Sequence, residues 1–134
     1  MPLRSMKRFI KQSGGTATVE TVLWFPLIIA IFGLMLDVAM IFHGQAKVLR
    51  IVQDANREFS IGRITTTAST ETTIENNLTA LGITATATTT QVAGTAFTVV
   101  DVPANQLQVL GYFSAFSGLS IQVADEYLIE NWEV

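Results

Sequence analysis

An apolar run from Thr21 to Phe42 is the feature that most limits what this chain can fold into. The run is 22 residues long and contains one charged side chain, Asp37. A helix of about 20 apolar residues crosses the roughly 30 Å hydrocarbon layer of a bilayer. The run therefore predicts a single transmembrane helix, and the rest of the 134 residues suffices for one small domain.

The charged residues are segregated along the chain. All eight Lys and Arg lie at or before Arg63, and seven acidic residues follow Ile64. Four of the basic residues precede the apolar run, which predicts a cytoplasmic N-terminus and an exported acidic portion. The acidic balance argues against a nucleic-acid partner, because nucleic-acid binding needs a basic surface.

The helical pattern continues beyond His43, which we interpret as an interfacial residue. Apolar residues recur there at spacings of three and four, and charged residues take another face, which is typical of an amphipathic helix. Gly62 is the predicted end of this helix. Within the apolar run, Trp24 is predicted to anchor the helix at the membrane interface. Pro26 belongs to the same anchor and should kink the helix or weaken one turn.

The sequence after Ile64 predicts a small head. Residues 64–73 are rich in threonine and indicate a linker, and Thr72 with Glu75 resembles a capping box. A short helix should follow and end at Gly82. Three strands are expected, namely 83–92 and 97–102, joined through Ala93-Gly94-Thr95, and one that carries Leu119, Ile121 and Val123, after a helical turn within 106–116.

The predicted fold class is therefore α+β. A long N-terminal helix, with a transmembrane half and an exported amphipathic half, packs on a small antiparallel sheet with one short helix. The predicted boundaries are a leader at 1–15, a transmembrane helix at 16–43, an amphipathic extension at 44–63 and an exported head at 64–134.

Two acidic residues occur at membrane depth, where charges are costly and tend to be functional. Glu20 stands at the start of the apolar run, and the hypothesis for it is a charge partner on the same or a neighbouring subunit. The alternative is an acid that faces the lipid headgroups. For Asp37 the two readings are an acid that reaches water near the outer interface and a contact with another helix.

The stretch GGTATVETVLWFPLIIAIFGLMLDVAMIFHGQAKVLRIVQDANREF resembles the TadE/TadF-like minor pilins, or pseudopilins, of tight-adherence (Flp-type) pilus systems. A basic leader, a glycine and an acid at the fifth place beyond it resemble a type IV prepilin signal. The positions that fit the pattern are Gly15, Glu20, Pro26, Asp37 and Arg57. Pseudopilins of type II secretion normally carry phenylalanine just after the glycine, whereas this chain has Thr16.

The resemblance implies a subunit of the bacterial inner membrane that prepilin peptidase cuts between Gly15 and Thr16. Glu20 and Asp37 would then contact other pilin and pilus-assembly subunits, and the apolar helix would contact membrane lipid. The resemblance leaves open which assembly step the protein serves and whether it enters the pilus.

The sequence offers no pattern for catalysis. There is no cysteine and one histidine, and neither a nucleophile–base arrangement nor a phosphate loop occurs. The C-terminal acids Asp125, Glu126, Glu130 and Glu133 lack the spacing of a calcium loop and are interpreted as a solvated edge. We therefore expect no enzyme activity, metal or cofactor. The remaining alternatives are an uncleaved single-pass membrane-anchored binding or regulatory protein, and a secreted domain released after Ala46.

Overall fold

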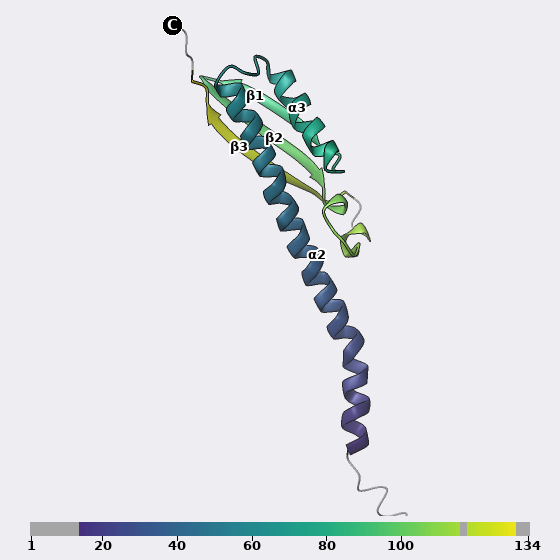
Figure 1. The fold of residues 1–134 in the computed structure, drawn as a ribbon. Coiled ribbons are helices and arrows are strands. Elements are labelled where there is room, and N and C mark those ends of the chain that lie inside the picture. Colours follow the sequence, from purple (N-terminus) through teal and green to yellow (C-terminus); the bar gives the residue numbers. More distant parts are fainter. Residues whose placement is uncertain (1–13, 116–117, 131–134) are drawn as a thin grey trace, which may run out of the picture. The chain divides into compact units, whose positions relative to one another are not determined.

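The computed structural model describes residues 14–115 and 118–130, and the side chains of residues 14–17 and 115 lie outside this description (Figure 1). The chain divides into two compact units, Met1–Met35 and Leu36–Val134. Its elements are the helices α2 (Gly14–Ser60) and α3 (Thr67–Ala80), the strands β1 (Thr86–Val92), β2 (Thr95–Pro103) and β3 (Ser120–Leu128), and the short 3-10 helices η1 (Ala104–Gln106) and η2 (Tyr112–Ala115).

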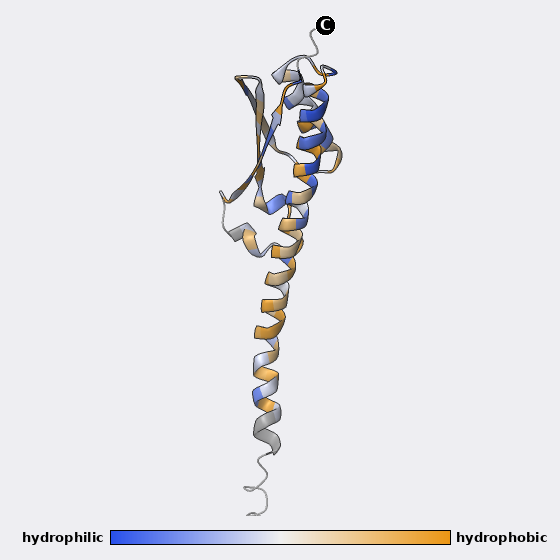
Figure 2. Ribbon diagram, turned by 90° about the vertical axis from the view of Figure 1, so that its left-hand side faces the viewer, coloured by the Kyte–Doolittle hydropathy of each residue, from blue (hydrophilic) through white to orange (hydrophobic). Residues whose placement is uncertain are grey.

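The described part of the first unit is the N-terminal portion of α2. From Thr18 to Met35 nearly every side chain is exposed, and most of them are apolar (Figure 2). A helix that is apolar on all sides is suited to a lipid environment, because no face is left for water.

The second unit contains a three-stranded antiparallel sheet in the order β1-β2-β3. Ala93 and Gly94 form the two-residue turn between β1 and β2, and both have positive φ, of 51° and 82°. This conformation fits the right-handed twist of a hairpin. The connection from β2 to β3 is longer and contains η1 and η2.

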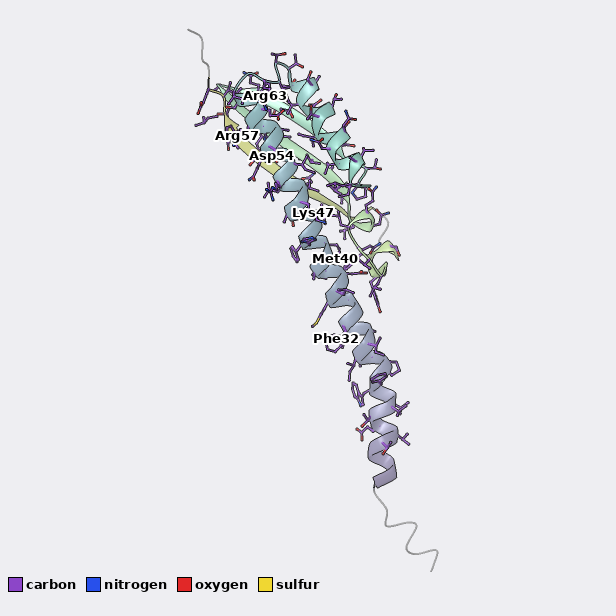
Figure 3. The ribbon with its side chains drawn as sticks, in the orientation of Figure 1. Phe32, Met40, Lys47, Asp54, Arg57 and Arg63 are labelled. Carbon is purple, nitrogen blue, oxygen red and sulfur yellow. The ribbon has the colours of Figure 1, made fainter. Side chains whose placement is uncertain are left out.

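One face of this sheet carries the hydrophobic core, which α3 and the C-terminal part of α2 cover (Figure 1). From α2 come Val48, Val52 and Ala55, and from α3 come Ile74 and Leu78. The sheet and its loops supply the other members, Ile83, Ala87, Val100, Val102, Leu107 and Val123. Most charged residues of this part of α2 are exposed instead, among them Lys47, Asp54 and Arg57 (Figure 3).

A buried polar network lies within this core. Asn56 of α2 is fully buried, accepts a hydrogen bond from the Thr98 hydroxyl at 2.7 Å and donates one to Asp125 Oδ2 at 2.9 Å. The hydroxyls of Thr98 and Thr89 are 3.1 Å apart and extend the network to β1. Near the end of the helix, the Ser60 hydroxyl donates to the carbonyl of Leu128 at 2.7 Å. These contacts join α2 to all three strands.

Helix α3 also covers the outer edge of β1. Glu71 and Glu75, one turn apart, accept hydrogen bonds from the backbone amides of Thr89 and Ala87 at 2.6 and 3.1 Å. An edge strand with free amides is a template for unwanted pairing. The two glutamates occupy those amides and so protect this edge.

The structure confirms the α+β fold and corrects several local predictions. Helix α3 begins at Thr67 with Thr66 as its N-cap, whose hydroxyl accepts from the amide of Ser69 at 3.1 Å. The predicted linker at 64–73 and the capping box of Thr72 and Glu75 were therefore wrong, because an earlier threonine provides the cap. Leu81 is the C-cap of α3 and is exposed, next to Gly82, where we predicted the helix to end.

Candidate functional site: the apolar helix and the Asp37 contact

The N-terminal part of α2 is long and apolar enough to cross a membrane. The mean hydropathy of its most apolar 18-residue window is 2.4, and only 11% of that window is buried. Trp24 is 55% exposed and Glu20, one turn earlier, is also exposed. The helix continues through Pro26, as membrane helices tolerate. These positions fit contact with lipid or with neighbouring subunits, and those assignments stay predictions.

The predicted cleavage site, Gly15 and Thr16, falls in the first turn of α2. Residues 1–13 of the predicted leader and the side chain of Thr16 lie outside the description, and the roles of the leader, Gly15 and Thr16 stay predictions. The predicted transmembrane helix starts at residue 16, whereas α2 begins at Gly14.

Asp37 is the best-defined polar site in α2. Its side chain is fully buried, and its carboxylate accepts three backbone hydrogen bonds from the connection between β2 and β3. Val109 and Leu110 donate to Oδ1 at 2.9 and 2.6 Å, and Tyr112 donates to Oδ2 at 2.9 Å. Backbone amides that converge in this way form a concave site for an anion. Here the anion is a carboxylate of the same chain.

The same connection contacts α2 a second time, two turns further along. Gly44 is buried beside Leu107, and a Cβ atom at position 44 would lie 2.7 Å from Leu107 Cδ2. A glycine is needed here because any side chain would displace Leu107 from the core. Gly111, with φ of 86°, allows the tight turn that brings the Tyr112 amide to Asp37.

The sequence suggested two interpretations of Asp37, and the first was an acid that reaches water near the outer interface. The structure differs from this first interpretation. Full burial excludes water contact at this position in the structure. The contact with another subunit, which the resemblance implied for Asp37, is not tested by this intramolecular arrangement and stays a prediction. No local pattern in the sequence around Val109 indicated that its loop would fold onto an acid 72 residues earlier.

The rest of the described chain offers no grouping that could hold a metal ion. Among residues 14–115 and 118–130, no three His, Asp or Glu side chains gather as a possible metal site. Asp125, which we had placed on a solvated edge, is partly buried and bonded to Asn56. Glu133, from the same predicted edge, lies outside the described residues.

These features define a protein with a long helix, apolar enough in its N-terminal part to cross a membrane, and a small α+β head. Residues 15–57 match the family model of TadE-like proteins, which supports a TadE-like protein of the Tad pilus system. The match covers the apolar part of α2 and most of its amphipathic part, and it includes Glu20, Pro26, Asp37 and Asn56. No curated protein and no solved structure gives a significant match to the chain.

Proposed function

We propose that this protein is a minor pilin, or pseudopilin, that assists assembly of a Flp-type pilus. In this proposal it is a single-pass subunit of the bacterial inner membrane with a cytoplasmic N-terminus and an exported head. It would contribute to adhesion or secretion through the pilus that it helps to assemble, and it would have no catalytic activity of its own. The observation that carries the proposal is the TadE-like match over residues 15–57 on a helix apolar enough to span a membrane.

Processing is the first step of the proposed function. Prepilin peptidase would cut between Gly15 and Thr16 and remove the basic leader. The new amine at Thr16 then lies four residues before Glu20, which is one turn of α2. An ionised carboxylate in a spanning helix costs on the order of 2.5–3.5 kcal/mol on insertion scales. A positive partner at Thr16, on the same or a neighbouring subunit, offsets that cost and gives Glu20 its role in docking.

The test is N-terminal sequencing of the full chain extracted from membranes of a host with active prepilin peptidase. The mature protein should begin at Thr16. Gly15→Leu should leave the precursor uncut, whereas Gly14→Leu is the matched control and should still be cut. A start at Met1 or Pro2 would support the uncleaved anchored protein instead, and a start at Lys47 would support a released secreted domain.

A further inference from the structure

The loop that binds Asp37 carries an apolar surface. Val109, Leu110 and Tyr112 are 59%, 54% and 41% exposed, and their three backbone amides converge on the single Asp37 carboxylate. The three residues therefore lie together beside the start of the head-packing part of α2. We call these three residues the apolar loop.

The sequence around the apolar loop is free of charge. No charged residue occurs between Asp101 and Asp125, although the chain after Ile64 is otherwise acidic. Exposed apolar side chains on a segment that carries no charge of its own are poorly suited to water, and such patches mark contacts with a partner or a membrane.

The position of Asp37 along α2 indicates what the apolar loop contacts. Asp37 follows Leu36 directly, where the charge-free stretch that begins at Thr21 ends. The predicted transmembrane segment at 16–43 is longer than the hydrocarbon layer requires, because its first 21 residues, from Thr16 to Leu36, already measure about 31 Å as a helix. Asp37 would then stand at the outer edge of that layer, and the apolar loop is bonded to it there.

Tyrosine is enriched at the interface between the hydrocarbon layer and the headgroups, and apolar side chains pack into the hydrocarbon beside it. The backbone amides that would be costly to bring there are occupied by Asp37. We propose that the apolar loop is a second membrane contact, inserted into the outer interface beside the end of the spanning helix and held in place by Asp37. This inference rests on the membrane anchoring in the proposed function.

The experiment uses the full chain, whose lack of cysteine makes single-cysteine variants straightforward. Leu110→Cys and the control Leu81→Cys, which is 57% exposed at the end of α3, are labelled with the fluorophore NBD. Each is reconstituted in phosphatidylcholine vesicles with and without phosphatidylcholine that carries a nitroxide near the headgroup. The label at position 110 should have a blue-shifted emission and several-fold stronger quenching by the nitroxide than the label at position 81.

A second variant tests the role of Asp37. Adding Asp37→Asn to Leu110→Cys replaces one acceptor oxygen with a donor group that faces the loop amides, so the quenching should fall. Asp54→Asn, on the exposed face of the same helix, is the matched control and should leave the quenching unchanged. Equal loss in both variants would overturn the positioning role of Asp37.

Other outcomes separate this inference from the proposed function. Flotation in a density gradient shows whether the chain is bound to the vesicles. If the chain floats with them but the label at position 110 is quenched no more than the label at position 81, the lipid contact of the apolar loop is refuted and the membrane anchor is not. A blue shift without lipid quenching that fades as the protein is diluted in lipid would assign the apolar loop to a second copy, and it would overturn the lipid assignment. A chain that does not float would refute both the anchor and the loop contact.

Discussion

The buried Asn56 gives the sharpest prediction about what holds the head together. Asn56→Ala removes the acceptor of the Thr98 hydroxyl and the donor to the Asp125 carboxylate, both of which cross from α2 to the sheet. We expect this substitution to destabilise the second unit strongly, although it makes the helix itself no weaker, because alanine is the better helix former.

The magnitude follows from the two hydrogen bonds. A neutral bond such as that from Thr98 contributes about 0.5–1.5 kcal/mol, and a bond to a charged acceptor such as Asp125 contributes about 1.5–3 kcal/mol. Their loss sums to about 2–4.5 kcal/mol, which corresponds to roughly a 30-fold to 2,000-fold change in an equilibrium constant. The bond that Thr98 can still form with Thr89 places the expected value toward the lower end.

The assay is hydrogen exchange, followed by mass spectrometry, on the full chain in detergent. The protection of peptides from β2 and β3 should fall by the stated factor in Asn56→Ala. The matched control is Asn76→Ala, an exposed asparagine of α3, which should leave protection unchanged or raise it slightly. Equal protection in the two variants would refute the network as a source of stability. Asn56→Asp should destabilise more at neutral pH, where two carboxylates would meet, and less in acid.

Three further predictions concern assembly, topology and pH. Glu20→Gln should insert and be cut normally yet fail to co-purify with partner pilins or to support pili, and normal recovery of both would show that Glu20 is only an interfacial acid. A phosphatase reporter fused after Val134 should be active, and activity of a cytoplasm-only reporter at that position would reverse the orientation. Hydrogen bonds from Gln122, and then from Ser120, lower the pKa of Asp101 from its usual 3.8. A carboxyl whose pKa is lowered on folding stabilises the fold at pH values above its pKa in the unfolded chain. The melting temperature of the wild type should therefore exceed that of Asp101→Asn at pH 7, and the difference should disappear as the pH falls below 3.8.

The periodic parts of the sequence predicted the structure well. Apolar spacing of three and four residues beyond His43 identified Val48, Val52 and Ala55 as the buried face of α2. Alternation predicted the third strand, where Val123 is buried, and the hairpin turn at Ala93-Gly94 was located correctly. Periodicity succeeds here because one face of each element meets the core and the other does not.

The parts that depend on contacts distant in sequence could not be predicted. Asn56 and Asp37 each form hydrogen bonds with residues about 70 positions away, and no pattern near them in the sequence identifies those partners. The start of α3 was misplaced for a local reason, because several threonines stand in a row and any of them can cap a helix. The proposed cleavage at Gly15 and the proposed docking through Glu20 would depend on other proteins, so the sequence supports them only through the family resemblance.

The buried polar side chains of α2 lie at the two ends of the part that packs on the head, and this placement indicates a shared role. Asp37 lies at the start of the part of α2 that packs on the head, and Asn56 and Ser60 lie at its end. Between them runs an apolar stripe of Val48, Val52 and Ala55, and a shift of α2 by one turn, about 5.4 Å, would exchange Val48 for Val52 at modest cost, although it would also bring a side chain against Leu107 where Gly44 stands. The same shift would break the hydrogen bonds at both ends and leave buried polar groups unpaired, which is costly. The apolar stripe therefore supplies most of the stabilisation, while the three polar side chains fix the register of the helix against the head.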